Sequence, residues 1–328
     1  MERILVSGAG SIGMRHLRNL QLLGINDLAI SDPSADQLNK VKDELNIETF
    51  SDFTEAINAF KPTIVFICGP TMVHVPQALE AAKAGAHLFI EKPLSHTNEG
   101  IDELKKEVAD RNLVCMVGCN MRFHPGPAMV KKLLSEGRIG PVIEAEVYTG
   151  SYLPNWRPHM DYRDSYSASR GQGGVTLDCI HEIDLALWYF GPAEVLGASI
   201  ISAASIDLPD IDGTADIDLI HDSKTKSSVH LSFTEPDYKR SCSITGENGY
   251  INWDFNEKKV EVKDPNGETT DAFPEPEGWE VNNMYVDEIK YFLNCVKEKK
   301  TPQGDLDEAQ AALIIAFKAR NEAKMSDK

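Results

Sequence analysis

The sequence lacks any apolar run long enough to cross a membrane. Its longest apolar stretches, such as residues 64–68, have the length of a buried strand, whereas a membrane-spanning helix needs about 20 apolar residues. Strand-like residues 4–6 come directly before a glycine-rich turn, which leaves no room for the apolar core of a signal peptide. We therefore expect a cytoplasmic protein without a membrane partner.

Basic residues are scarce relative to acidic ones. The 328 residues include 33 Lys and Arg against 51 Asp and Glu, which gives a formal net charge of −18. A field of this sign repels phosphate backbones and anionic lipid surfaces, so we expect no nucleic-acid partner. It still permits a small anionic ligand in a locally basic pocket.

Cysteine is also sparse. The six cysteines are scattered, with no CxxC pair and no Cys/His spacing typical of a metal site. Reduced, buried thiols in a cytosolic protein are the simplest interpretation. We expect neither a disulfide framework nor a metal.

The length predicts two domains, each large enough for a core of its own. In residues 1–120, apolar strand runs alternate with helical segments; the strands are expected at residues 4–6, 28–32, 48–50, 63–68, 87–91 and 113–119. Apolar strands separated by helices are typical of a parallel sheet covered on both faces. We therefore predict that residues 1–120 form an α/β domain with a doubly wound parallel sheet, a Rossmann domain.

The pattern changes in residues 121–328. Apolar and charged residues alternate along residues 143–147, and turn signals punctuate several short strands. This favours a C-terminal α+β domain built on a mostly antiparallel open sheet, closed by helices at about 283–297 and 306–323. The last helix can pack back on the first domain. An open sheet with a partner-covered face also predicts a homodimer or homotetramer.

A glycine-rich loop follows the first expected strand and opens a helix. It reads Gly8-Ala9-Gly10-Ser11-Ile12-Gly13. Gly8 permits the tight turn, Gly10 lets a pyrophosphate approach the backbone, and Gly13 lets the helix pack closely on the strand. The free amides at the helix N-terminus, including those of Ser11 and Ile12, favour a bound phosphate. We interpret the loop as a dinucleotide site; the alternative is a purely structural turn.

Asp32 follows the second expected strand. Its carboxylate is placed to accept hydrogen bonds from both ribose hydroxyls of an adenosine. Residues 33–35 contain no Arg or Lys that would neutralise a 2′-phosphate, so we predict NAD rather than NADP. The alternative role for Asp32 is a helix N-cap before Pro33.

Two further motifs carry a resemblance to a known family. Glu91-Lys92-Pro93 follows the fifth expected strand, and Gly69-Pro70-Thr71 follows the fourth. Together with Gly173-Gly174-Val175 and residues 181–188 they resemble the glucose–fructose oxidoreductase / inositol dehydrogenase / MocA (Gfo/Idh/MocA) family, over nearly the whole chain. The resemblance implies an NAD-dependent oxidoreductase. Its substrate would be a small molecule, a secondary alcohol or ketone of a sugar, nucleotide-linked sugar or cyclitol.

The resemblance also implies site residues. Lys92 would lie beside the nicotinamide and favour the substrate alkoxide as hydride leaves; the alternative is a surface loop lysine. Arg122 would lie near cofactor or substrate, or brace a carboxylate between the domains. His74 would flank the nicotinamide side or serve a structural role. The remaining residues implied near the cofactor are Gly69, Pro70, Thr71, Glu91 and Asn120.

Asp178 and His181 supply the second half of the expected chemistry. Residues three apart share a helix face, so both side chains are expected to face the nicotinamide. The imidazole suits a general base or acid, and Asp178 would orient it or contact sugar hydroxyls. Many family members place the Asp four residues before the His with a glycine between, and this chain departs from that pattern. The alternatives are a helix N-cap for Asp178 and a packed core residue for His181.

Residues 151–172 form an expected loop rich in aromatic and basic side chains. It contains Trp156, Arg157 and Arg163, as well as Tyr152, His159, Tyr162, Tyr166 and Arg170. Aromatic faces stack on sugar rings, and arginines bind phosphate or carboxylate in bidentate fashion. We expect this loop to close over a substrate with an anionic group; the alternative is a subunit interface.

Two other functions are compatible with the sequence. The same fold can serve a redox-neutral NAD-dependent lyase or hydrolase acting on a sugar, or a non-catalytic nucleotide-sensing regulator. Lys92 together with His181 favours an enzyme, because a sensor needs no proton donor.

Overall fold

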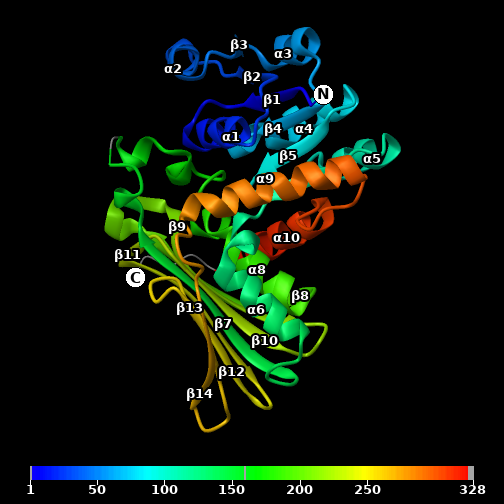
Figure 1. Ribbon diagram of the computed structural model, residues 1–328. Coiled ribbons are helices and arrows are strands. Elements are labelled where there is room, and N and C mark those ends of the chain that lie inside the picture. Colours follow the sequence, from blue (N-terminus) through cyan, green and yellow to red (C-terminus); the bar gives the residue numbers. More distant parts are fainter. Residues whose placement is uncertain (1, 159, 324–328) are drawn as a thin grey trace. The chain divides into compact units, whose positions relative to one another are not determined.

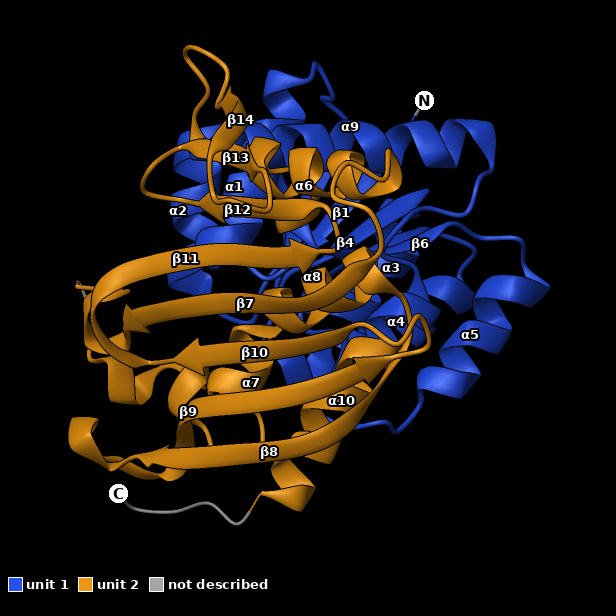
Figure 2. Cartoon of the chain, turned by 90° about the horizontal axis from the view of Figure 1, so that it is seen from below, with its two compact units in different colours: residues 1–120, 281–310 blue, residues 121–280, 311–328 orange. Residues whose placement is uncertain are grey.

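The computed structural model describes residues 2–158 and 160–323, which form two compact units (Figure 2). Unit 1 comprises Met1–Asn120 and Val281–Gln310, and unit 2 comprises Met121–Glu280 and Ala311–Lys328. One break thus falls at residue 120, and residues 281–310 belong to the first unit. Among the described residues, no helix is long and apolar enough to cross a membrane.

Unit 1 is built on a six-stranded parallel sheet in the order β3-β2-β1-β4-β5-β6 (Figure 1). The strands are β1 (Ile4–Ser7), β2 (Leu28–Ser31), β3 (Glu48–Phe50), β4 (Ile64–Ile67), β5 (His87–Glu91) and β6 (Cys115–Gly118). Its helices are α1 (Ser11–Leu22), α2 (Ala35–Leu45), α3 (Phe53–Phe60), α4 (His74–Lys83), α5 (Ile101–Asp110) and α9 (Val281–Glu298), with a 3₁₀ turn η1 (Thr71–Val73). The doubly wound Rossmann prediction is confirmed. The strand order reverses between β1 and β4, and in such sheets ligands bind at the carboxyl ends of these strands.

Unit 2 is built on an eight-stranded sheet in the order β14-β13-β12-β11-β7-β10-β9-β8. The strands are β7 (Val142–Tyr152), β8 (Ala193–Ala203), β9 (Leu208–His221), β10 (Lys226–Ser232), β11 (Thr234–Gly246), β12 (Gly249–Asp254), β13 (Lys259–Lys263) and β14 (Thr269–Pro274). The pairs are antiparallel except β7 with β10, so the mostly antiparallel prediction is confirmed.

One face of this sheet carries the helices of unit 2. These are α6 (Pro125–Ser135), α7 (Val175–Asp178) and α8 (Ile180–Phe190), and Figure 2 looks onto the opposite face. Ala145 and Val147 point to the covered face, whereas Glu144 and Glu146 are exposed. Ile143 departs from the expected alternation, since it is 52% exposed near the start of β7. Helix α10 (Leu306–Glu322) begins in unit 1 and ends in unit 2.

Two local predictions are wrong. Residues 151–172, expected as a structureless loop, contain three short 3₁₀ helices, η3 (Leu153–Asn155), η4 (Tyr162–Asp164) and η5 (Tyr166–Ala168). The single helix expected across Asp178 and His181 is broken at Cys179, whose backbone angles (φ −95°, ψ 31°) are not helical. Helical spacing survives a one-residue break, so the sequence pattern conceals it. The other 3₁₀ segments are η2 (Asn120–Phe123) and η6 (Ala204–Ile206).

Candidate active site

The glycine-rich loop of unit 1 has the geometry that a bound dinucleotide requires. Gly8 has a positive φ of 96°, and a Cβ there would lie 2.7 Å from the Gly69 nitrogen. A Cβ on Gly13 would lie 1.9 Å from the Gly8 oxygen, so α1 packs directly on the turn. At Gly10, by contrast, a Cβ would meet no described atom within 4 Å. Gly10 is the N-cap of helix α1 and provides no side-chain cap, which leaves the first amides of the helix for a phosphate group. These residues fit the pyrophosphate of NAD.

Asp32 is fixed to the same loop. Its Oδ2 accepts a hydrogen bond from the Ala9 amide at 2.7 Å, and its Oδ1 accepts one from the Ser34 amide at 2.8 Å. The N-cap of α2 is Ser34, which accepts from Gln37, so the N-cap alternative for Asp32 is wrong. A carboxylate has about four lone-pair sites, which leaves acceptors for ribose hydroxyls.

His74 joins the loops that follow β4 and β5. The ring is buried, with Nε2 2.9 Å from the Gly69 oxygen and Nδ1 2.9 Å from the Pro93 oxygen. Burial lowers the pKa of His74, and the hydrogen bonds with the Gly69 and Pro93 carbonyl oxygens offset part of this effect by raising it. The structural role considered for His74 therefore has a clear basis: it ties the turn with Pro70 and buried Thr71 to the one after Lys92.

Glu91 holds the backbone at Lys92. Its side chain is buried, with Oε1 2.6 Å from His16 Nε2, and its Oε2 accepts from the Lys92 amide at 3.2 Å. His16 lies on the inner side of α1, packed against Phe66 and Phe89. Sequence reasoning missed His16, because no motif distinguishes a buried histidine that contacts a site residue from one that only fills the core. Lys92 itself is half-buried.

Arg122, in unit 2, is held by a carboxylate of the same unit. Its Nε and Nη2 donate to Asp184 at 2.8 and 2.6 Å, and both side chains are buried. The guanidinium also lies 5.5 Å from the centre of the Trp188 ring. Arg122 and Asp184 belong to unit 2, so the expectation of a carboxylate braced between the domains is wrong for this pair. Asn120, the last residue of unit 1, is buried at the start of η2.

Asp178 and His181 are both buried, 3% and 7% exposed. Asp178 is the last residue of α7 and Cys179 is the N-cap of α8, so the helix-cap alternative for Asp178 is wrong. The Asp178 carboxylate faces the hydroxyl of Tyr166, and its charge is the largest cause of the raised pKa of Tyr166, ahead of burial. The site in unit 2 therefore includes Tyr166, which composition alone could not select from the other aromatic residues of its loop.

Of the candidate ligand-binding residues in the loop, Arg157 lies near Asp178, whereas Trp156 and Arg163 contact other residues. The Arg157 guanidinium lies 5.1 Å from the centre of the Tyr166 ring, which brings it into the surroundings of Asp178. Trp156 donates from Nε1 to Ser151 at 2.9 Å and packs edge-on against Phe233. Arg163 is 52% exposed and pairs with Asp161 at 2.7 Å. His159 lies outside the described residues.

The sequence and the fold both have known relatives. Residues 2–119 match the model of the oxidoreductase family with an NAD-binding Rossmann fold (GFO/IDH/MocA), and residues 128–252 match the C-terminal domain model of the same family. The chain is 27% identical to the scyllo-inositol 2-dehydrogenase (NAD⁺) of Bacillus subtilis, covering 97% of this chain and 93% of that protein.

Two relatives come from Thermotoga maritima. The chain is 28% identical to a myo-inositol 2-dehydrogenase, covering 97% of this chain and 95% of the relative. A crystal structure of a probable dehydrogenase superposes with a TM-score of 0.82 at 26% identity, covering 98% of this chain and 96% of that one. The glycine-rich loop, the strand order and these matches agree, and the chain belongs to the GFO/IDH/MocA family of NAD-dependent oxidoreductases.

Proposed function

We propose that the chain exchanges a hydride between NAD and the carbon of a secondary alcohol on a cyclitol or sugar. The observation that carries this proposal is the buried pair Asp178 and His181 in a chain whose glycine-rich loop fits a dinucleotide. Buried carboxylate and imidazole groups are characteristic of proton-transfer sites. Two relatives that cover nearly the full chain are inositol 2-dehydrogenases, which makes cyclitols the first substrates to test.

We assign each site residue one role. NAD, when bound, supplies the acceptor for the hydride. The Lys92 ammonium donates a hydrogen bond to the reacting oxygen and stabilises the alkoxide that develops there. His181 takes the hydroxyl proton in oxidation and returns it in reduction. Asp178, whose carboxylate faces Tyr166, orients the ring or a sugar hydroxyl.

We assign the anionic-group contact of the loop to Arg157 rather than to Arg163. Arg163 is already paired with Asp161 at the surface, so binding another anion would require breaking that pair. Arg157 lies over Tyr166, beside Asp178. An Arg at this position can bind a carboxylate or phosphate of the substrate in bidentate fashion. Trp156 supplies an aromatic face for a sugar ring.

The function is tested by a substrate screen followed by two substitutions. Purified protein with NAD⁺ is assayed for NADH formation on scyllo-inositol, myo-inositol and a set of neutral, acidic and nucleotide-linked sugars. Lys92→Met and His181→Ala are each expected to lower kcat about 100-fold or more, because each removes a group that handles the proton in the transition state. Affinity for NAD, measured by fluorescence titration, should change much less in His181→Ala.

A matched pair of arginine variants controls for loss of surface charge. Arg157→Met should raise KM for an acidic substrate at least about tenfold, whereas Arg163→Met should leave it near the wild-type value. Wild-type kcat in both Lys92→Met and His181→Ala would remove the proposed chemistry. Tightly bound NAD with product formation but no net NADH would favour the redox-neutral alternative instead.

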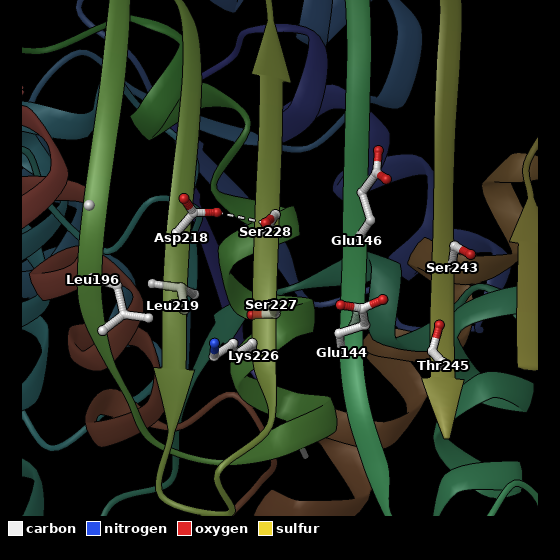
Figure 3. Close-up of a pocket in the computed structure, with 12 residues that line it drawn as sticks. Glu144, Glu146, Leu196, Asp218, Leu219, Lys226, Ser227, Ser228, Ser243 and Thr245 are labelled. Atoms are coloured by element: carbon white, nitrogen blue, oxygen red, sulfur yellow. Dashed lines mark hydrogen bonds between the residues drawn. The ribbon is translucent and has the colours of Figure 1, made fainter. Parts of the chain in front are cut away.

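We further propose a cytoplasmic homodimer or homotetramer that associates through the open sheet face of unit 2. All six cysteines are buried and none forms a disulfide within the described part of the chain, as suits a reducing compartment. The open face has a hollow of about 560 Å³ whose lining includes Glu146, Asp218, Lys226 and Leu196 (Figure 3), and Leu196 is 58% exposed. Sedimentation at micromolar concentration should give a mass two or four times the 36.3 kDa of one chain. The mass of a monomer would contradict this proposal.

A further inference from the structure

A double-glycine turn precedes the helix that carries Asp178. Gly174 has a positive φ of 95°, and a Cβ there would lie 1.8 Å from Asp212 Oδ1 and 2.6 Å from Arg320 Nη2. A Cβ on Gly173 would lie 2.3 Å from the backbone oxygens of Tyr166 and Ser167. The turn is therefore enclosed on one side by an ion pair and on the other by the loop segment that contains Tyr166.

The ion pair binds the turn through both of its members. Arg320 Nη2 donates to the Gly173 oxygen at 2.6 Å and to the two Asp212 oxygens at 2.8 and 3.1 Å. Asp212 Oδ2 in turn accepts from the Thr176 amide at 2.9 Å and from the Thr176 hydroxyl at 2.7 Å. Asp212, on β9, thus caps the N-terminus of α7, where the helix has no cap of its own.

The loop side of the turn is held by backbone bonds. The Gly173 amide donates to the Ser169 oxygen at 2.8 Å, and the Gly174 amide donates to the Ser167 oxygen at 3.0 Å. A shift of the turn would therefore move the Tyr166 segment and α7 together. These are the two elements whose side chains, Tyr166 and Asp178, face each other.

We infer that Asp212 and Arg320 are positioning residues that fix the Gly173–Gly174 turn and, through it, the placement of Asp178 and His181. The inference rests on the proposed function, because it concerns the residues that handle the proton. Neither residue is expected to contact the substrate. Asp212 is 8% exposed, so removing the arginine leaves a nearly buried carboxylate without its counter-charge and loosens the cap that it forms.

The test uses the full-length protein with NAD bound. Arg320→Gln should lower kcat about 10- to 100-fold, since small displacements of catalytic groups have effects of this size. KM for NAD should stay within about twofold, because the dinucleotide loop belongs to unit 1. Amide hydrogen exchange in residues 175–178 should be about fivefold faster or more, as expected for a lost cap. Exchange in β10 serves as the internal reference.

Two further variants keep the test decisive. Arg320→Lys retains the charge but not the fork of donors, so its kcat should lie between those of wild type and Arg320→Gln. If Arg320→Gln does not fold, Arg320→Lys against wild type decides the question. Arg138→Gln removes an exposed arginine that pairs with Asp271 in the same unit, and it should leave kcat and exchange unchanged.

The outcomes separate the two proposals. Wild-type kcat together with wild-type exchange in folded Arg320 variants would overturn the positioning role. Full activity in Lys92→Met and His181→Ala would overturn the proposed function instead, whatever the Arg320 variants do. If no substrate is found in the screen, hydrogen exchange in residues 175–181 still decides whether the pair holds this segment.

Discussion

Gly10 and Gly13 belong to one motif, yet the space around them differs. A side chain at Gly13 would overlap the Gly8 oxygen, whereas one at Gly10 meets no described atom within 4 Å. The motif predicted both roles from the sequence, because each glycine serves a known step in binding a pyrophosphate. The open space at Gly10 is available to a bound pyrophosphate, whereas the close contact at Gly13 lets α1 pack on the turn.

Alanine substitutions should separate these two roles. Gly10→Ala should change the free energy of unfolding by no more than about 1 kcal/mol and weaken NAD binding at least about tenfold, because the methyl group occupies the space of the pyrophosphate. Gly13→Ala should destabilise the protein by about 2 kcal/mol or more, because α1 must move away from the turn. Chemical unfolding and NAD titration measure the two quantities. Wild-type NAD affinity in Gly10→Ala would place the dinucleotide elsewhere.

The residues that sequence reasoning missed share a physical feature. Each of them acts through a contact with a residue distant in the sequence. His16 is 75 positions from its partner Glu91, and Asp212 is 108 positions from its partner Arg320. Motif spacing reports only local geometry, so it identified Lys92 and His181 as candidates but not the groups that hold the surrounding backbone. For Arg163 the residue type suggested a contact with the ligand, whereas in the structure its guanidinium forms an ion pair with the nearby Asp161.

At the scale of elements, helix α6 depends on a histidine cap. His124 Nδ1 accepts a hydrogen bond from the Gly126 amide at 3.1 Å, which requires that nitrogen to be unprotonated. The ring is buried against Trp253 and Trp279. Burial, with a smaller contribution from the charge of Arg240, lowers the pKa of His124 to about 4. Protonation therefore opposes both the cap and the packing.

The sign of the resulting pH dependence follows from linkage. The unfolded chain, with a histidine pKa of about 6.5, binds a proton at higher pH than the folded chain does, so stability falls as the pH drops below about 6.5. Between pH 7 and pH 5 the loss from this residue is about 2 kcal/mol. His124→Asn keeps a capping oxygen without the titration, so urea unfolding of this variant should show a smaller loss over that range. An identical loss in both proteins would rule out His124 as the source.

The elements of unit 1 were predictable, but those of unit 2 were predictable only in part. Strand and helix periodicity located the parallel sheet of unit 1 to within a few residues, whereas alternation and turn signals indicated a mostly antiparallel sheet in unit 2 without giving the bounds of strands such as β8 and β9. The break at Cys179 was not predicted, because residues 175–190 contain no Gly or Pro and show no helix-stop signal before Gly191. The cap for α7 comes from Asp212 on a distant strand, which no local pattern reveals.

At the scale of the whole molecule, the chain does not divide at a single point. Residues 281–310 return to unit 1, where α9 packs on α1: Asn282 donates to Asn19 at 2.8 Å, and Arg15 lies 4.4 Å from the centre of the Tyr285 ring. Helical spacing predicted α9 but not its partner, since an amphipathic stripe does not specify which surface covers it. The same holds for the open sheet of unit 2. The alternation of apolar and polar residues shows that the sheet has a second face, but it does not show what covers that face.

The proposed function depends on direct hydride transfer between the substrate carbon and the nicotinamide. The most direct measurement uses the cyclitol or sugar that turns over in the screen, deuterated on its carbon-bound positions, with mass spectrometry of the NADH formed. Direct transfer predicts NADH that carries a single deuterium, with a slower rate for the labelled substrate where hydride transfer limits turnover. Unlabelled NADH, or product formed without any exchange of label with the cofactor, would contradict it.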